Sequence, residues 1–443
     1  MLMTLRKIFL FTLVSCFLLV TQTGCEEDRP QRVEGAEETT SPAHLGEWME
    51  QLTAIIRSTN LRGPQASRIL AYASIAYYQG YSMSSDEMRS LVGQLQGLDE
   101  LPEPDPELIY NYGVIAEAAM HRTLAHHFED APINIKLVLS STYSSHERDY
   151  SVIGVSDAVI ERSREFGWLL GDAINIWSDS DGYEEVIQCS KTLPIGPQYW
   201  KPTLTSFSGP ELACWGDIRP FTFPNDQLIT LCHPGLPEDF STTPQSQYEN
   251  DLIELIEYKA NLNAEQEAIA KFWNDGNGSF TVPGHYVSIL AQLIDQNLLD
   301  GKETVTAWAQ LCIAMADTYV STYKLKYTYF TVRPITVIRA NNDADWESYL
   351  LNPATPEFPS LRATMAYSAT QVLINLYGDI EFRDNSQSIF NLGERHYPSF
   401  TEMGREAAYS RLYAGTNLRS TLDRSEYHGR CIAQRANELF LNQ

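Results

Sequence analysis

The chain has 443 residues, of which 43% are hydrophobic and 20% are charged, an ordinary balance for a folded protein with a large core. Its formal net charge of −25 argues against nucleic acid and anionic membrane surfaces as partners, because both repel an acidic protein. A pocket lined by cations would therefore be a local exception in this chain.

The first 25 residues predict a targeting segment. Arg6-Lys7 precedes an apolar run, Ile8–Val20, that has the length of a signal-peptide core and is short for a membrane span. Thr23-Gly24-Cys25 resembles a lipobox, although Gln22 departs from the usual leucine. We predict lipidation at Cys25, with plain secretory cleavage as the alternative. Either route places the protein outside the cytoplasm, in the periplasm or at the cell surface, and a lipid would tether it to a membrane.

The next residues predict a linker and then a helical body. Residues 26–44 are polar, acidic and aperiodic, as expected of a flexible linker, and residues 45–443 form the predicted folded domain. Apolar residues recur at helical spacing from Ala66 to Tyr77, from Leu108 to Ala118 and ahead of Trp177. No alternating pattern of useful length competes, so the first half is predicted to be helical.

A long irregular segment follows at residues 191–247, which contain nine prolines. Such a segment inside a compact domain is usually functional or covers a site. Helical periodicity returns at Tyr248 and is clearest from Trp308 to Tyr319. We therefore predict an all-α fold, a large bundle of two packed helical halves, with the functional site in residues 246–443.

The cysteines predict at least one free thiol. Five remain if Cys16 leaves with the signal and Cys25 carries lipid. Cys312 lies on an apolar helix face and is expected to be buried, while Cys214 and Cys232 flank a loop-rich stretch and are candidates for a disulfide. No Cys-x-x-Cys motif occurs, and we predict no metal site.

Three short pieces of the second half combine cations with a hydroxyl group: Lys326-x6-Arg333-Pro334, Pro359-Ser360-Leu361-Arg362 and Ser410-Arg411-x5-Asn417. Arginine offers a forked set of donors that matches phosphate-like oxygens, and lysine adds a compact charge. Ser360 follows a proline and precedes an apolar run, so it is predicted to be a helix N-cap whose free N–H groups face an anion. The Lys-x6-Arg-Pro piece alone is typical of a solvated charged face, and Pro-Ser alone is a weaker signal still. Together they predict a pocket for a tetrahedral oxyanion.

These pieces resemble the signature of vanadium-dependent haloperoxidases, type 2 phosphatidic acid phosphatases and bacterial class A acid phosphatases. That signature reads Lys-x6-Arg-Pro, Pro-Ser-Gly-His and Ser-Arg-x5-His-x3-Asp. Four further runs resemble the bacterial haloperoxidase branch: Trp215–Phe221, Phe272–Gly276, Pro283–His285 and Ala316-Asp317. The resemblance covers about residues 45–441. Because relatives are often dimeric, it also raises a homodimer as one option.

The chain departs from the signature at its catalytic positions. Leu361-Arg362 replaces Gly-His, Asn417 replaces the histidine that is the nucleophile in phosphatases and the vanadium ligand in haloperoxidases, and Thr421 replaces the aspartate. An amide nitrogen has no available lone pair, and a guanidinium group stays protonated, so neither substitute performs the family's chemistry. Another histidine, such as His285, His396 or His428, could substitute only if the fold brought it to the site.

We therefore predict a secreted, lipid-anchored protein that binds a phosphate- or vanadate-like oxyanion and has lost or altered catalysis. One alternative is an active haloperoxidase or phosphatase with a rearranged site. The other is a non-catalytic surface interaction protein whose cations are paired with Asp or Glu. The predicted oxyanion-binding residues are Lys326, Arg333, Ser360, Leu361, Arg362, Arg411 and Asn417.

Overall fold

The computed structural model describes residues 42–203, 209–224, 227–276, 278–296, 301–439 and 441. Within these residues the fold is all-α, as predicted, with one small two-stranded antiparallel sheet. The predicted signal peptide, Cys25 and linker residues 26–41 lie outside them. Residues 42–44, the end of the predicted linker, already belong to the first helix.

The first-half helices are α1 (Pro42–Thr59), α2 (Gly63–Ser82), α3 (Tyr112–His127), α4 (Ile133–Val152), α5 (Asp157–Asp179) and α6 (Tyr183–Gln188), followed by the 3-10 turn η1 (Trp215–Asp217). The second half contains α7 (Gln247–Ala260), α8 (Ala264–Phe272), α9 (Thr281–Asp295), α10 (Gly301–Tyr329), α11 (Pro334–Asn341), α12 (Leu361–Tyr377), β1 (Phe382–Asp384), η2 (Ser386–Phe390), β2 (Arg395–Tyr397), α13 (Phe400–Tyr413) and α14 (Arg419–Asn437).

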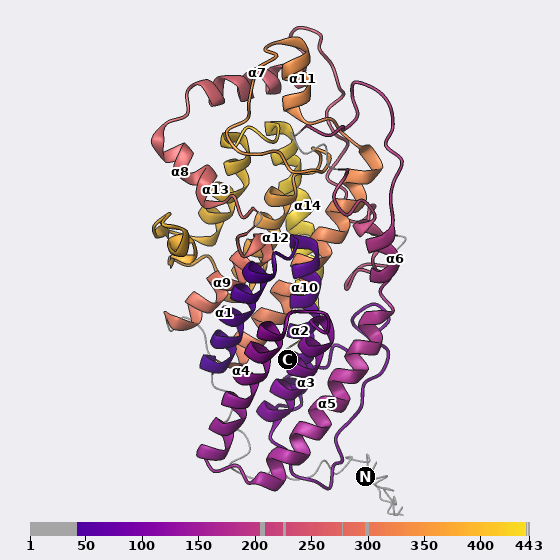
Figure 1. Ribbon diagram of the computed structural model, residues 1–443, viewed down its shortest axis with the longest axis vertical. Helices are drawn as coiled ribbons and strands as arrows, with labels where there is room; N and C mark the ends of the chain where they lie inside the picture. The colour runs from indigo at the N-terminus through magenta and orange to yellow at the C-terminus, as the bar shows by residue number, and fades with distance from the viewer. Residues whose placement is uncertain are drawn as a thin grey trace, which may run out of the picture.

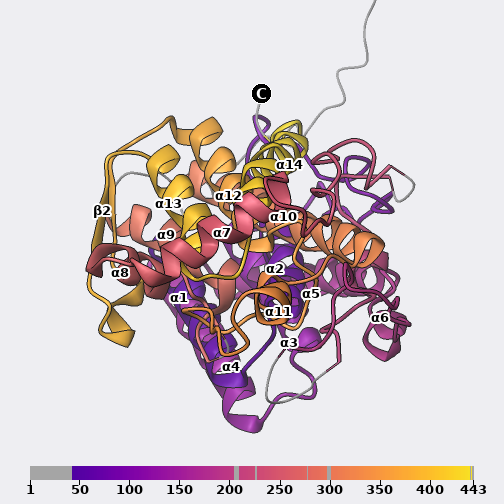
Figure 2. The same ribbon diagram turned by 90° about the horizontal axis from the view of Figure 1, so that it is seen from above.

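Two groups of helices meet along α10. Figure 1 shows α2–α5 at one end of the molecule and α12–α14 toward the other. Helix α10 packs against α2 in the first group and against α12 and α14 in the second. Viewed from above, α10 and α2 lie near the middle (Figure 2). The predicted Trp308–Tyr319 stripe belongs to this central helix, whose residues 304–323 are buried on every face, with polar side chains such as Gln310 and Asp317 included.

One predicted helix begins later than its sequence pattern suggests. Leu108 and Ile109 are 43% and 48% exposed and precede α3, which starts at Tyr112. The side chain of Asn111 accepts a hydrogen bond from the Val114 N–H group at 3.0 Å and caps the helix there. The apolar residues before the cap therefore belong to a loop.

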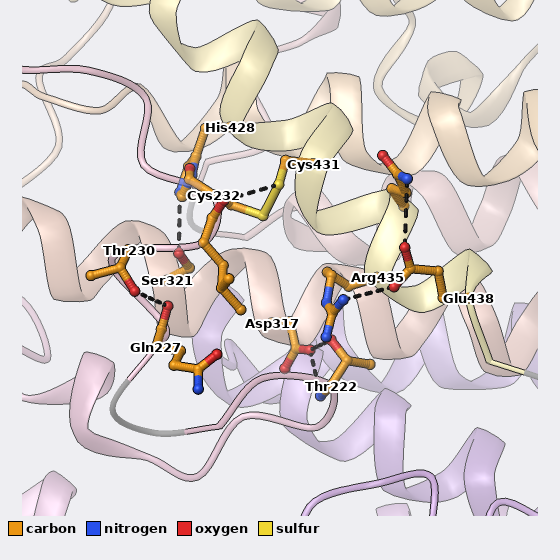
Figure 3. The surroundings of a disulfide bond; sticks show 12 residues. Thr222, Gln227, Thr230, Cys232, Asp317, Ser321, His428, Cys431, Arg435 and Glu438 are labelled. Carbon is orange, nitrogen blue, oxygen red and sulfur yellow. Dashed lines mark hydrogen bonds and ion pairs between the residues drawn. A yellow bond between two sulfur atoms is a disulfide. The ribbon is translucent and has the colours of Figure 1, made fainter.

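The predicted Cys214–Cys232 disulfide is wrong. Cys189 pairs with Cys214, Cys232 pairs with Cys431 of α14, and Cys312 is free and buried. The sequence separation of 199 residues between Cys232 and Cys431 hid their proximity, which arises because the irregular segment passes over α14 (Figure 3).

The irregular segment is also fixed to α10 by a buried carboxylate. Asp317 accepts hydrogen bonds from the N–H groups of Phe221 at 2.7 Å and Thr222 at 2.9 Å, and from the Thr222 hydroxyl group (Figure 3). Burial raises the pKa of Asp317 to about 6, although these hydrogen bonds act to lower it.

Of the helices in the described ranges, none combines the length and apolar character needed to cross a membrane.

Candidate oxyanion site

A cavity of about 1540 Å³ lies where the ends of several helices meet. Residues at the N-terminal ends of α2, α9, α11 and α12 form part of its wall, and the C-terminal part of α10 forms another. The structure brings all seven predicted residues to this wall: Lys326, Arg333, Ser360, Leu361, Arg362, Arg411 and Asn417. The volume leaves room for an organic group beside an oxyanion.

The Lys-x6-Arg spacing does not put its two cations on one helix, because α10 ends at Tyr329 and α11 begins at Pro334. Lys326, in the last turn of α10, donates to the carbonyl oxygens of Pro356 at 2.6 Å and Glu357 at 3.2 Å. Arg333 is the N-cap residue of α11. Its guanidinium group donates to the carbonyl oxygens of Thr355 (2.8 Å) and Thr416 (3.0 Å) and to the Thr355 hydroxyl group (3.0 Å).

The other two cations are held in the same way. Arg411, in the last turn of α13, donates to the carbonyl oxygen of Trp273 at 2.9 Å and to that of Ala270 at 3.3 Å. Arg362, in the first turn of α12, donates to the carbonyl oxygens of Asn274 and Asp275. Neutral backbone carbonyls thus orient all four basic side chains.

No carboxylate of the described residues lies within ion-pair distance of Lys326, Arg333, Arg362 or Arg411. Burial, together with mutual repulsion, lowers the pKa of Lys326 and Arg411 well below their usual values and that of Arg333 to about 10. The guanidinium groups nevertheless remain protonated at neutral pH. Glu357 and Asp275 oppose this lowering from a distance, but the cluster lacks the direct carboxylate contact that a bound anion would replace.

Ser360 is the N-cap residue of α12, as predicted. Its side chain does not cap the helix: the buried Oγ has no hydrogen-bond partner among the described residues, while its N–H group donates to Ser425 Oγ at 3.0 Å. Buried hydroxyl groups are normally satisfied, and an oxyanion oxygen at this helix start would accept from this one.

Asn417 lies between α13 and α14, just after Gly415, whose φ of +75° turns the chain into the cavity. Its Nδ2 group donates to the carbonyl oxygen and to Oε1 of Glu357, both at 3.0 Å. The Glu357 carboxylate also accepts from the Leu418 N–H group at 3.1 Å and from the Thr421 hydroxyl group at 2.8 Å. A buried carboxylate therefore does reach positions 417 and 421, but it comes from Glu357, a residue that the sequence analysis did not single out.

No histidine is found among the described residues that line the cavity. His285 is buried between Asp275, at 3.1 Å from Nδ1, and Asp384, at 3.0 Å from Nε2. Burial lowers its pKa, but the two carboxylates outweigh burial and raise the pKa to about 10. His285 is thus already committed to two partners.

The other two histidines considered as substitutes have partners elsewhere. His428 interacts through Nδ1 with the carbonyl oxygen of Cys232 at 2.6 Å, and burial lowers its pKa to about 4 (Figure 3). His396 is exposed and lies 2.7 Å from Glu381.

Three acidic residues of the cavity wall, Glu211, Asp275 and Glu347, were not identified as site residues from the sequence. Glu211 belongs to the irregular segment, whose composition carries no periodic signal. Burial raises the pKa of its carboxyl group, against the opposing effect of Arg62 and Arg362. A carboxyl group with a raised pKa therefore lies in the cavity that holds the cations.

The comparisons agree with this architecture. Residues 306–442 match the family model described as the VCPO second helical-bundle domain. The structure of a protein described as the first bacterial vanadium-dependent iodoperoxidase superposes with a TM-score of 0.82 and 26% sequence identity, covering 94% of this chain and 99% of that one. The chain is therefore haloperoxidase-like: its second helical bundle matches that family model, and its fold is shared with the bacterial enzyme.

Two more distant members share the fold. An apo-type bacterial vanadium-dependent chloroperoxidase has 17% identity and a TM-score of 0.61, covering 85% of this chain and 94% of its own. A holo-type structure has 15% identity and a TM-score of 0.60, covering 93% and 96%. A search of curated proteins found no match.

The residues of the cavity fit part of what vanadate requires. Lys326, Arg333 and Arg411, with the free hydroxyl group of Ser360, match the oxygens of a tetrahedral anion. No imidazole of the described cavity wall reaches the anion, and the Asn417 amide is turned to Glu357. The site therefore fits an oxyanion held by charge and hydrogen bonds, and it does not fit vanadium ligated by histidine.

Proposed function

We propose that this protein binds a tetrahedral oxyanion, phosphate or vanadate, in the cavity, and that the family's turnover has been lost or altered. The observation that carries the proposal is the group of four converging cations without a carboxylate partner in the described residues. Isolated buried charges are strongly unfavourable, so the arrangement is best explained by an anionic ligand.

The contrast with other arginines argues against a purely structural role for the cluster. Arg68, which is also buried, is paired with Asp181 at 2.6 Å. Arg419, two residues after Asn417 in the sequence, forms an ion pair with Glu254 at 2.6 Å. A surface interaction protein whose cations were structural would be expected to pair the cavity cations in the same way.

The replaced histidines support the loss of family chemistry. The Asn417 Nδ2 group donates hydrogen bonds to Glu357. Because an amide nitrogen has no available lone pair, it cannot attack a phosphoryl group or ligate vanadium. Arg362 binds charge but does not release a proton at working pH. Phosphoryl transfer through position 417 is therefore absent in this proposal.

The second candidate function is an enzyme with a rearranged site. Glu211 favours it, because a carboxyl group with a raised pKa lines the cavity beside Arg362 and is able to exchange a proton where the family histidine is missing. The 26% identity to a protein described as an iodoperoxidase makes halide oxidation the first reaction to test.

The proposal includes an extracytoplasmic location with lipidation at Cys25. Two disulfides within the folded body support it, since such bonds persist in oxidising compartments. Metabolic labelling with a fatty acid should mark the wild-type chain and not Cys25→Ser, which should be released from the membrane fraction. Equal labelling of both proteins would contradict lipidation at this residue.

Sedimentation of the purified chain would decide between monomer and homodimer.

The main experiment is a thermal titration with phosphate and with orthovanadate. A ligand at 100 times its Kd stabilises the folded state by about 2.7 kcal/mol. We expect this stabilisation for wild type and its loss in Arg411→Gln and Lys326→Gln. Arg430→Gln is the matched control, because Arg430 pairs with Glu426 on α14 and does not line the cavity.

Two outcomes would change the assignment. Equal stabilisation of wild type and both cavity variants would remove the oxyanion site. Iodide oxidation with vanadate and peroxide, or hydrolysis of a phosphate monoester, that exceeds background and is lost in Glu211→Gln would establish the second function instead.

A further inference from the structure

A second buried polar cluster lies outside the cavity and joins three helices of the first half. His44 lies in the first turn of α1, Glu117 on α3 and His146 on α4. Each offers one ligand atom, and these atoms all lie within 4.8 Å of one another. None of the three lines the oxyanion cavity. They therefore form a separate site.

The distances within this trio suit a shared cation. His44 Nδ1 lies 3.8 Å from Glu117 Oε1, and His146 Nδ1 lies 3.3 Å from Glu117 Oε2. Two ligands of a tetrahedral zinc ion, bound at about 2.0–2.2 Å, are about 3.4 Å apart. The two imidazole rings are stacked with centroids 4.1 Å apart, so their nitrogens lie close together, and the rings rotate out of the stack to point both Nδ1 lone pairs at one ion.

Carboxylates hold the far nitrogen of both rings. His44 Nε2 lies 3.1 Å from Asp149, and His146 Nε2 lies 3.0 Å from Glu47. A carboxylate at Nε2 favours the tautomer with its proton there and leaves the Nδ1 lone pair free for a ligand. Metal-binding histidines are typically oriented by such a partner. Trp48 completes the surroundings by donating from Nε1 to Glu117 Oε2 at 2.5 Å.

Two buried atoms of the trio have no partner among the described residues. These are His44 Nδ1 and Glu117 Oε1, and the Glu117 side chain is only 1% exposed. Burying polar atoms without partners is costly, and native structures rarely do so without an unseen ion or water. A proton on His146 satisfies Glu117 Oε2 but leaves both of these atoms unsatisfied. A cation between them satisfies both.

We propose that His44, Glu117 and His146 bind one divalent transition-metal ion of the zinc class. Two imidazoles and one carboxylate match the ligand preference of zinc, whereas calcium and magnesium prefer oxygen ligands alone. Solvent supplies the fourth ligand at the edge of His44, whose side chain is 12% exposed. The ion ties the first turn of α1 to α3 and α4 and so anchors the start of the folded body.

The test is a titration of the metal-depleted full chain with zinc chloride, followed by calorimetry and thermal unfolding. We expect one equivalent of zinc to bind and the melting temperature to rise by several degrees. His44→Gln and Glu117→Gln should weaken binding at least tenfold and abolish the rise. His126→Gln is the control, because His126 is exposed, pairs with Asp179 and lies outside the trio.

Cobalt(II) provides a readout that does not depend on stability. Its visible absorption should show a tetrahedral site with nitrogen and oxygen ligands in wild type and His126→Gln, and should be lost in His44→Gln. The proposal is overturned if no stoichiometric zinc binds, or if His44→Gln and Glu117→Gln bind as wild type does. It is equally overturned if the cluster responds to pH alone, as a proton shared between His146 and Glu117 would require.

Discussion

Two neighbouring regions of the molecule bury positive charge in opposite ways. In the cavity, Lys326, Arg333 and Arg411 donate to backbone carbonyl oxygens and have no carboxylate at ion-pair distance among the described residues. Beside it, the buried imidazole of His285 lies between Asp275 and Asp384 at 3.0–3.1 Å. Asp275 belongs to both regions, since it also lines the cavity and its carbonyl oxygen accepts from Arg362.

This difference in partners distinguishes cations that stabilise the fold from cations that are available to bind a ligand. A buried cation with its own carboxylates is satisfied inside the protein and stabilises the fold only while both partners remain. Buried cations held by neutral carbonyls next to a large cavity are satisfied only when an anion enters. The resemblance to haloperoxidases does not by itself distinguish these cases, because it concerns residue types and not their partners.

The largest expected change in stability comes from removing one of the two carboxylates that flank His285. Asp384→Asn should destabilise the protein by about 3–5 kcal/mol, because it leaves the buried His285 with one carboxylate fewer. Urea unfolding measures this loss. Glu381→Gln is the control: it removes the carboxylate of the exposed pair with His396, which should cost less than about 1 kcal/mol. Similar losses in the two variants would show that His285 does not depend on its buried carboxylates.

Stability should also depend on pH with opposite signs for two buried histidines. The pKa of His285 is raised to about 10, so its contribution is complete below the unfolded value of about 6.5 and is lost as the pH rises toward 10. The pKa of His428 is lowered to about 4, so its contribution is present above about 6.5 and is lost as the pH falls toward 4.

Each histidine should change the free energy of unfolding by about 1.4 kcal/mol per pH unit within its range. Urea unfolding at several pH values should therefore show maximal stability near neutral pH. Asp384→Asn should flatten the alkaline side and His428→Asn the acidic side. An alkaline side unchanged in Asp384→Asn would mean that His285 is not held as a cation.

Placing a histidine at position 417 should allow the cavity to ligate vanadium directly, where the wild-type site would hold vanadate only by charge and hydrogen bonds. Asn417→His places a metal ligand next to Glu357, whose carboxylate is positioned to orient the ring. We expect vanadate affinity to rise by about tenfold, equivalent to about 1.4 kcal/mol, with phosphate affinity little changed. Asn352→His is the matched control, because Asn352 lines the same cavity outside the motif. An equal gain in both variants would show that position 417 has no special place at the anion.

The smallest expected change in anion affinity comes from replacing Glu357, the buried carboxylate that lies near Lys326 and Arg333. Glu357 opposes the lowering of the pKa of Lys326 and Arg333, although its oxygens are bonded to Asn417, Leu418 and Thr421. Glu357→Gln should make the cavity more positive and tighten phosphate binding a few-fold, or by less than about 1 kcal/mol. Glu347→Gln, at an exposed residue of the cavity wall, should change affinity less. Weaker phosphate binding by Glu357→Gln would show that its hydrogen bonds matter more than its charge.

Much of the fold was predictable because helical periodicity is a local property. The stripe from Trp308 to Tyr319 and the N-cap position of Ser360 follow from spacing and neighbouring residues, and both are found as predicted. Local patterns failed where a polar cap overrode an apolar run, as Asn111 does at the start of α3.

The sequence by itself determined which charges are available, that the chain is all-α, and that the family histidines are missing at positions 362 and 417. Only the tertiary structure decided which charges have partners. It joined Cys232 to Cys431, brought Glu357 to Asn417 and Glu211 to the cavity, and gathered His44, Glu117 and His146 from three helices. These contacts link residues far apart in the chain, and no periodicity encodes them because they depend on how whole helices pack.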